Sequence, residues 1–537
     1  MADEQKDTKW QTESGIPLKN VYRPEDLAGL DYDRDLGDPG KPPFTRGPYP
    51  EMYRSRLWRI SQLTGSGSVG ETSKLLQFFN EVGGDWVNLD RDQLTSNHLW
   101  DPDHPEVLAR KDDVGATGVP ILSLADLEEV LKDVALEKRY IHMVGTPWMN
   151  SLYFSLAEKR GIPLTDLHGT GQGEMTLTYV STPFKDFPHP RCTLRNNGDL
   201  IEFHTKYVPH VVPVSVAGHN VRADGVTAYQ ELAVVLANNI EYIEEVLRRG
   251  KLGIDEFAAN LGGINYSIGR DFFEEICKCR AGRRMWYKLL TERYHSKDPR
   301  SWRLRIHGFS ADRDYTYQQP LVNIVRSAYR TVAAALAGCQ SLGIGPYDEA
   351  ITNPTEEALL MAVRTHQVIQ LESGITNVAD PLAGSYYVEW LTNELEQKAW
   401  EYLAKIEAVG GYLKAIETGW LHQECIKAAL EQEKKLATGE KKLVGANCFQ
   451  MAEEPFQVPA RRPARAWDEA MAKVEKLRRE RDNSRVTKAL DGLKRAIESD
   501  ENQIPAMMEV AKSGATVGEV GKVYRDIWGI WNAPIKF

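Results

Sequence analysis

Residues Phe44 to Ser68 read FTRGPYPEMYRSRLWRISQLTGSGS and combine arginines, aromatic rings and prolines in one short stretch. Prolines fix φ and remove a backbone donor, so we expect the part from Pro42 to Pro50 to run extended. Arginine offers forked donors to phosphate, and aromatic rings offer flat apolar contact. The stretch is therefore typical of a segment that binds a long, phosphorylated and partly apolar ligand. The alternative is a basic surface loop that its own aromatic side chains hold in place.

The composition is that of a globular protein with more than one domain. The chain has 537 residues, of which 42% are hydrophobic and 26% charged. A net charge of -10 argues against nucleic acid as the main partner. We find no apolar membrane span, no targeting segment at the N-terminus and no cysteine spacing typical of a disulfide framework or a metal site. We therefore expect a cytoplasmic protein without membrane contact and without a metal site of its own.

Short apolar runs alternate with amphipathic helix patterns over some 350 residues of the chain. Buried strands are predicted at YIHMVGT from Tyr140, VVPVSVAG from Val211 and RLRIHGF from Arg303. Helices are predicted from Ala228, Asp271 and Pro320. This alternation favours parallel strand pairing, either in a (β/α)8 barrel or in a doubly wound open sheet.

The two ends of the chain lack this alternation. The first 40 residues or so are polar and rich in Asp, Gly and Pro, which predicts an extended arm that wraps a partner. The tail after about residue 400 is helical, which predicts an appendage packed on the barrel or on another chain. Trp528 and Trp531 favour a contact surface there, and docking on the chain itself is the alternative.

The segment TRGPYPEMYRSRLWRISQ resembles the substrate-entry segment of the adenosylcobalamin-dependent acyl-CoA mutases, the methylmalonyl-CoA mutase family. Further segments resemble the family in the family's order, from about residue 40 to the end: DPDHP from Asp101, VGATGVPILSLADLEEVL from Val114, RLRIHGFSA from Arg303, QQPLVNIVRSAYR from Gln318, QSLGIGPYDEAITNPTEEA from Gln340 and QLESGITNVADPLAGSYYVEWLT from Gln370. The resemblance implies an α/β fold, a (β/α)8 TIM barrel over residues 59–400. An extended arm with a coenzyme A-contacting segment (1–58) would precede it, and a helical appendage for subunit contact (401–537) would follow.

The resemblance also implies an isomerase that rearranges the carbon skeleton of an acyl-CoA by radical chemistry. Coenzyme A would thread the barrel axis, and adenosylcobalamin would face the C-terminal mouth of the barrel. The sequence ends where the family's cobalamin domain would begin, which implies a separate small subunit that carries the lower axial histidine. A G-protein chaperone is a further partner that the resemblance implies.

Site residues follow from the positions that match the family's motifs. Tyr49, Met52 and Arg56 match coenzyme A contacts, and Thr170 and Gln172 match the pair near the thioester. Three further residues match positions at the cofactor face: Arg305, His307 and Glu349. A core role for the histidine and a helix-capping role for the glutamate are the alternatives.

Several departures from the family's pattern bear on the substrate. Leu63 stands where methylmalonyl-CoA mutases have Tyr, and Thr182 stands where they have the Arg that grips the substrate carboxylate. His219 and Asn220 replace the paired Tyr-His. A buried carboxylate without a partner costs several kcal/mol, so we expect methylmalonyl-CoA to be a poor substrate.

Two substrate classes remain open. Leu63, with Asp90 in NLDRD as a hydroxyl-binding acid, resembles 2-hydroxyisobutyryl-CoA mutase. Alternatively, bulky side chains line a pocket for a larger, aryl-like acyl group: Trp86, Trp100, Trp148 and Phe309. A substrate carboxylate would then need a new cationic partner, for which the candidates are Lys185, Arg191, Arg195 and Arg222.

Two motif matches and one alternative function complete the sequence evidence. Gly65, Gly67 and Gly70 match G-x-G-x-x-G, which would indicate an NAD(P)-dependent dehydrogenase if the glycines joined a strand to a helix in a dinucleotide fold. His168 lies in a D-x-H-x-x-G match of the kind that coordinates cobalt, but the companion motifs are missing, so we interpret it as accidental. The altered pair His219-Asn220 leaves open a non-catalytic barrel that binds an acyl-CoA and a small subunit.

Overall fold

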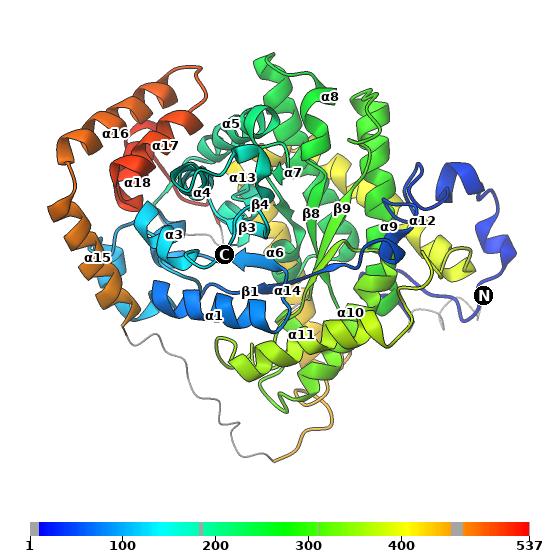
Figure 1. Ribbon diagram of the computed structural model, residues 1–537. Helices are drawn as coiled ribbons and strands as arrows, with labels where there is room; N and C mark the ends of the chain where they lie inside the picture. The colour runs from blue at the N-terminus through cyan, green and yellow to red at the C-terminus, as the bar shows by residue number, and fades with distance from the viewer. Residues whose placement is uncertain (1–9, 182–185, 311, 453–464, 536–537) are drawn as a thin grey trace.

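The computed structural model describes residues 10–181, 186–310, 312–452 and 465–535. In this part of the chain, nine parallel strands form one sheet with helices around it (Figure 1). The order across the sheet is β6-β4-β3-β2-β1-β10-β9-β8-β7. The strands are β1 (Arg59–Leu63), β2 (Trp86–Leu89), β3 (Tyr140–Val144), β4 (His168–Gln172), β6 (Val211–Val212), β7 (Val216–Ala217), β8 (Gly263–Ile268), β9 (Arg305–Ser310) and β10 (Ser341–Gly343).

The sheet closes on itself at one broken strand. β6 pairs with β4 and β7 pairs with β8, so these two short strands stand at opposite ends of the strand order. Only three residues separate them in the sequence, beginning with Pro213, which has no N–H to offer the ladder. Ser215 N then donates to Gly171 O on β4 at 2.7 Å. β6 and β7 are therefore two halves of one strand, the ring has the eight positions of a (β/α)8 barrel, and the open-sheet alternative is wrong.

The helices alternate with the strands as the sequence predicts. The helices of the barrel are α1 (Val69–Glu81), α3 (Leu124–Val130), α4 (Pro147–Lys159), α5 (Pro190–Tyr207), α6 (Gly218–Ala223), α7 (Ala228–Arg249), α9 (Phe272–Lys288), α10 (Val322–Leu336) and α11 (Glu356–Leu371). Local signals set their ends. In α7, for example, Thr227 and Gln230 form a capping box, and Gly250 ends the helix in the left-handed region at φ 69°. None of the helices in the described part of the chain is long and apolar enough to cross a bilayer.

The proline-rich segment does not run extended, contrary to the prediction. Residues 38–47 form successive turns, in which Phe44 N donates to Lys41 O and Gly47 N donates to Phe44 O. Phe44 takes φ 65°, a left-handed conformation. The buried Arg283 donates to the carbonyl oxygens of Phe44 and Thr45, both at 2.9 Å, and so holds the turn against the barrel. Proline fixes φ but not ψ, so the same residues suit a turn as well as an extended run.

The described N-terminal residues wrap the chain's own barrel. Tyr22 packs on the rings of Tyr387 and Trp390 in α12 (Tyr386–Ala408), and this part of the chain lies beside that helix in Figure 1. Glu13 forms ion pairs with Arg222 on α6 and with Lys441, which lies just after α14 (Trp420–Ala437). The arm therefore has a docking site on this chain.

The tail is helical and packs on the barrel as well. Its helices are α13 (Tyr412–Glu417), α14 (Trp420–Ala437), α15 (Ala466–Glu480), α16 (Asn483–Glu498), α17 (Ile504–Ser513) and α18 (Val517–Trp528). α17 lies against α4 and α5 (Figure 1), and its Met507 and Val510 share one apolar cluster with Leu152 of α4. Trp531 in β11 (Ile530–Trp531) pairs with Phe187 and packs on Tyr179, so it docks on the chain itself. The domain limits near residues 58 and 400 stay predictions, and residue 400 falls inside α12.

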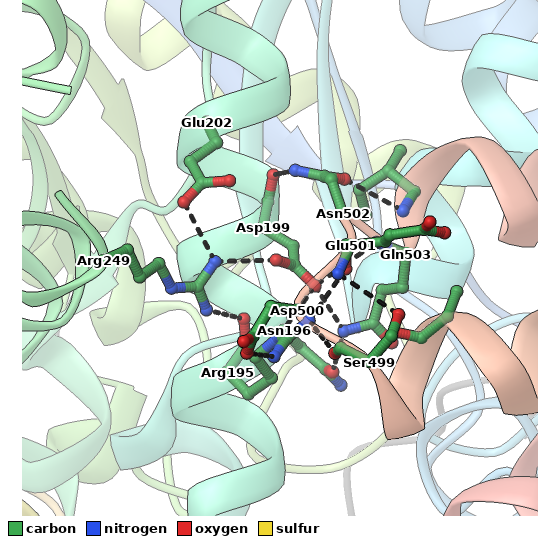
Figure 2. A network of polar contacts seen from close by, with 12 residues as sticks. Arg195, Asn196, Asp199, Glu202, Arg249, Ser499, Asp500, Glu501, Asn502 and Gln503 are labelled. Atoms are coloured by element: carbon green, nitrogen blue, oxygen red, sulfur yellow. Dashed lines mark hydrogen bonds and ion pairs between the residues drawn. The ribbon is translucent and has the colours of Figure 1, made fainter. Parts of the chain in front are cut away.

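A buried polar network fixes the tail to the barrel (Figure 2). At its centre is Asp199 on α5, whose carboxylate accepts from Arg249 Nη1 at 2.6 Å and from Arg195 Nε at 3.2 Å. The same carboxylate accepts from Gln503 Nε2 at 2.7 Å, just before α17. One fully buried acid thus joins α5, α7 and the tail.

Replacement of Asp199 by Ala leaves Arg249 buried without its closest carboxylate. We expect this change to lower the stability by about 1 to 3 kcal/mol, because buried donors lose a shared acceptor while Glu245 and Glu202 still balance the charge of Arg249. The midpoint of urea-induced unfolding, followed by tryptophan fluorescence, measures the loss. Asp500 contacts Arg195 from a fully exposed position, and the matched variant Asp500→Ala should unfold as the wild type does. Equal midpoints for the Asp199→Ala variant and the wild type would contradict the assigned role.

Candidate functional site

The barrel interior is lined by polar side chains at alternate positions of the strands. On β9, Arg305 and His307 line one cavity along the axis and Phe309 lines another. On β4, Thr170 and Gln172 are buried and bond to residues of β3 and β8, respectively. Barrels of this type are usually filled with branched apolar side chains. A polar, partly hollow interior therefore indicates a binding site inside the barrel.

The larger of these spaces, which we call the axial cavity, has a volume of about 830 Å³. It opens at the N-terminal ends of the strands and reaches inward to Thr170, Asn265 and His307. The first residue at each of the eight strand positions lines it: Arg59, Trp86, Tyr140, His168, Val211, Gly263, Arg305 and Ser341. The segment before β1 covers its entrance with Tyr49, Met52 and Arg56.

Cationic and imidazole groups surround the entrance of the axial cavity. Arg59 pairs with Asp85 at 3.3 Å and lies over the Tyr140 ring at 4.8 Å from its centroid. Arg305 donates to the carbonyl oxygen of Ala259 at 3.2 Å. His168 stacks on His210 with ring centroids 5.3 Å apart. Burial, that neighbour and the nearby arginines lower the pKa of His168. This entrance suits an anionic ligand group.

A hydrogen-bonded layer crosses the barrel at mid-height. His142 on β3 bonds through Nδ1 to Thr170 Oγ1 and through Nε2 to Gln172 Oε1, the latter at 2.8 Å. Asn265 Nδ2 donates to the same Gln172 Oε1 at 3.4 Å, and Ser215 Oγ donates to Asn265 Oδ1 at 3.2 Å. Burial lowers the pKa of His142 to about 4, so its imidazole is neutral near pH 7. The layer can orient a polar group of a ligand without adding charge.

A second space, the C-terminal cavity, has a volume of about 430 Å³ and lies at the carboxyl ends of β1, β2, β9 and β10. It brings together Leu63, Asp90 and Glu349, which are far apart in the sequence. Desolvation raises the pKa of Asp90 to about 7, and the nearby Arg91 opposes the rise. Among the described residues that line this cavity there is no Lys, Arg or His. The two ends of the barrel therefore differ in charge.

His219 and Asn220 lie in the first turn of α6, which begins at Gly218 directly after β7, also at the C-terminal end of the barrel. The His219 ring lies 5.3 Å from the ring of Phe309, which lines the C-terminal cavity. His219 Nδ1 and Asn220 Oδ1 are buried without a hydrogen-bond partner among the described residues. Burial, with a contribution from His142, lowers the pKa of His219 to about 4. These two polar atoms are available to a ligand.

The predicted site residues fall into two groups at opposite ends of the barrel. Tyr49, Met52, Arg56, Thr170, Arg305 and His307 line the axial cavity, whereas Leu63, Asp90 and Glu349 line the C-terminal cavity. Arg305 and His307 were predicted to lie at the same face as Glu349, but both line the axial cavity, and Arg305 begins β9 at the other end of the barrel. Gln172 lies in the polar layer between the two groups. Thr182 falls outside the described residues, as does Lys185.

The other cationic candidates for a substrate carboxylate are engaged elsewhere. Arg191 pairs with Glu417, Arg195 with Asp199, and Arg222 with Glu13 and Glu275. None of the three lines either cavity. The prediction was therefore wrong for these three arginines, because the folded chain brings each of them to a carboxylate outside the cavities.

Of the four bulky residues that were predicted to enlarge the pocket, two line a cavity. Trp86 lines the axial cavity and Phe309 the C-terminal cavity. Trp148 is a core residue of the apolar cluster between α4 and the tail. Trp100 stacks on His104 with ring centroids 4.3 Å apart, outside both cavities. The prediction was wrong for these last two.

The glycine motif joins β1 to α1, but in a barrel. A Cβ on Gly65 would lie 1.8 Å from Asp90 O, so the backbone of this loop passes directly over the end of β2. Gly67 takes φ 72°, and Gly67 N donates to Gly115 O at 2.8 Å. Close packing of the loop explains both glycines, and the dinucleotide fold of the dehydrogenase interpretation is absent from the described strands.

The sequence analysis missed several residues of the interior. His142, Asn265, Ser215 and Tyr140 all line or support the axial space. The available signal was the alternation within strands: His142 in YIHMV and Asn265 in GINYSI are polar residues inside otherwise buried strands. A polar residue at the inward position of a barrel strand is a candidate for function.

Comparison with known proteins agrees with this architecture. A sequence model of the methylmalonyl-CoA mutase family matches residues 11–530. The 2-hydroxyisobutanoyl-CoA mutase large subunit of Aquincola tertiaricarbonis is 37% identical over 536 residues, which cover 98% of this chain and 94% of that protein. The methylmalonyl-CoA mutase of Cereibacter sphaeroides is 34% identical, covering 98% of this chain and 74% of that protein. The human mitochondrial methylmalonyl-CoA mutase is 32% identical, with 97% and 69% covered. With this match along nearly its whole length, the chain belongs to the methylmalonyl-CoA mutase family of acyl-CoA mutases, which are isomerases of the intramolecular transferase class.

Proposed function

We propose that this chain is the large, substrate-binding subunit of a two-component adenosylcobalamin-dependent mutase for an acyl-CoA other than methylmalonyl-CoA. The observation that carries the proposal is the charge contrast along the barrel axis. Arginines surround the entrance of the axial cavity. The C-terminal cavity instead contains Asp90, and none of the described residues that line this cavity is cationic.

Coenzyme A would enter through the axial cavity. Arg56 and Arg305 would face its phosphates, and Tyr49 and Met52 would contact its apolar parts. The acyl end would then reach the polar layer at Thr170. The axial cavity between this layer and the entrance has a volume of about 830 Å³. The cavity is within the range of sites that hold ligands of this size.

The C-terminal end of the barrel suits the cofactor. The C-terminal cavity, Glu349 in its wall, and the unpartnered buried atoms His219 Nδ1 and Asn220 Oδ1 provide space and polar groups for one face of a nucleoside-bearing ligand. When bound, adenosylcobalamin supplies the radical that starts the rearrangement. Glu349 would hold its ribose, and the buried interior would keep water from the reacting centre. The relative with 37% identity is named as a large subunit, which supports a small, cobalamin-binding partner for this chain.

The acyl group most compatible with the C-terminal cavity carries a hydroxyl group. A second carboxylate, as in methylmalonyl-CoA, would meet Asp90 rather than an arginine. A hydroxyl group can instead donate to the ionised Asp90, a charge-assisted hydrogen bond. Leu63 beside it leaves an apolar surface for a methyl group. We therefore favour a 2-hydroxyisobutyryl-like acyl-CoA over a bulkier, aryl-substituted one.

The entrance arginines can be tested with a matched pair of variants. Arg56→Ala should raise the KM for acyl-CoA about three- to tenfold and leave kcat unchanged, because it removes a contact made equally before and during the reaction. Arg54 lies in the same turn, is exposed and does not line the cavity, so Arg54→Ala serves as the control. A similar rise in KM for both variants would indicate a general charge effect and not a phosphate contact.

The role of Asp90 can be tested in the enzyme reconstituted with a cobalamin-binding small subunit. With 2-hydroxyisobutyryl-CoA, kcat/KM should rise as the pH increases through about 7, where Asp90 ionises. Asp90→Asn should lower this value about 10- to 100-fold, the cost of a lost hydrogen bond to a charged group, and should abolish the pH dependence. The matched substrate without the hydroxyl group, isobutyryl-CoA, should bind both forms equally. Faster turnover of methylmalonyl-CoA than of 2-hydroxyisobutyryl-CoA would refute the assignment. Binding of acyl-CoA without radical formation and without turnover would favour the non-catalytic alternative.

The pocket departures give a gain-of-function test. The double variant Leu63→Tyr, Thr182→Arg restores the residues that methylmalonyl-CoA mutases use at these positions. Because the new arginine would pair with the substrate carboxylate, turnover of methylmalonyl-CoA should increase over the wild type in the same reconstituted assay. The single variants serve as controls, and no improvement in the double variant would show that these positions do not line the acyl site together.

A further inference from the structure

The amide group of Gln172 is held in one orientation by donors on both sides. Its Oε1 faces His142 Nε2 at 2.8 Å and Asn265 Nδ2 at 3.4 Å. The two donors come from different strands, β3 and β8, which lie on either side of β4 in the ring of strands. An amide oxygen accepts two hydrogen bonds, so this arrangement satisfies Oε1 completely.

Each of the two donors is itself fixed by a further hydrogen bond. Asn265 Oδ1 accepts from Ser215 Oγ at 3.2 Å, so the Nδ2 of Asn265 is turned toward Gln172. His142 Nδ1 faces Thr170 Oγ1, whose hydroxyl hydrogen it can accept. A neutral imidazole with an acceptor at Nδ1 carries its hydrogen on Nε2, the atom that faces Gln172. In each chain, Thr170 to His142 and Ser215 to Asn265, every hydrogen bond can therefore be donated in the direction of Gln172 Oε1.

The consequence concerns the other end of the amide. With Oε1 occupied by two donors, Gln172 Nε2 keeps both of its hydrogens, and no hydrogen bond from the described residues uses them. The nitrogen is not among the polar atoms that are sealed from solvent without a partner. Thr170 and Asn265, its neighbours in the layer, line the axial cavity. Gln172 Nε2 is thus a neutral donor that no described residue uses, and it belongs to the layer that borders the inner end of this cavity.

We propose that His142 and Asn265 are positioning residues that lock the Gln172 amide so that its Nε2 donates to the thioester carbonyl oxygen of the substrate. The inference rests on the proposed acyl-CoA ligand, in which this carbonyl is the acceptor next to the migrating group. The donor is set before the substrate arrives, so no reorientation has to be made at the moment of reaction. Without His142, the amide can rotate and present its oxygen to the carbonyl, which repels it.

The test compares two ligands that differ only at the carbonyl: isobutyryl-CoA and its thioether analogue S-isobutyl-CoA. Calorimetry with the purified full chain measures the dissociation constant of each. The wild type should bind the thioester about five- to tenfold more tightly than the thioether, the worth of one neutral hydrogen bond. His142→Phe, which keeps the ring volume, should reduce this ratio to about one by weakening thioester binding alone.

Two further variants keep the test decisive. Asn265→Leu removes the second donor and should also reduce the ratio, which covers the case that His142→Phe does not fold. His168→Phe is the matched control, since His168 is an exposed imidazole at the start of β4, at the cavity entrance and away from the Gln172 amide. It should weaken both ligands by the same factor and leave their ratio unchanged.

The outcomes separate this inference from the proposed function. If the wild type binds neither ligand, the acyl-CoA site itself is refuted, and the inference with it. If the wild type binds both ligands equally, or if His142→Phe and Asn265→Leu both keep the wild-type ratio, the positioning role is wrong while the acyl-CoA site stands.

Discussion

The barrel depends on a backbone hydrogen bond at its broken strand, from Ser215 N to Gly171 O. Pro213 interrupts the ladder between β6 and β7, and this bond joins the two halves so that the ring of strands closes. The same residue, through its hydroxyl group, begins the chain of hydrogen bonds that passes through Asn265 to Gln172. Closure of the fold and orientation of the site therefore share one residue, and a barrel that opened here would lose both.

The interior of the barrel has a sequence of environments along its axis. Arginines and imidazoles surround the entrance, neutral hydrogen-bonding groups form the middle, and Asp90 stands in a cavity without a described cation at the far end. Burial keeps His142 and His219 neutral near pH 7 and raises the pKa of Asp90 to about 7. Such an arrangement accepts a ligand that is anionic at one end only, because a second negative charge at the far end would be desolvated without a partner.

The segments outside the barrel stabilise it from two sides. Near the N-terminus, Glu13 pairs with Arg222 on α6, the helix that carries His219 and Asn220 in its first turn. In the tail, Gln503 bonds to Asp199, and this links the last helices to α5 (Figure 2). Both are polar contacts with little exposure to solvent. Breaking either contact would leave a desolvated polar or charged group without its partner, so each one holds its segment in one position on the barrel. The helix that carries part of the site is thus held by residues from distant parts of the sequence.

The sequence by itself determined what depends on local pattern. The alternation of apolar strands with amphipathic helices gave β3, β9, α7 and α10, and the family segments gave a barrel with Leu63 and Asp90 near one acyl site, which the shared cavity supports. The strands and helices follow from period and capping, which neighbouring residues specify, whereas the barrel and the pairing of Leu63 with Asp90 were implied by the family resemblance.

Only the tertiary structure decided which residues meet across the barrel. It placed Arg305 at the entrance, directed Arg195 and Arg222 to acids outside the site, folded the proline segment into turns on Arg283, and brought His142 and Asn265 to opposite sides of Gln172. The physical reason is that a hydrogen bond or an ion pair depends on distance and direction between side chains of different strands. Strand register and ring closure set these quantities, and no local pattern in the sequence contains them.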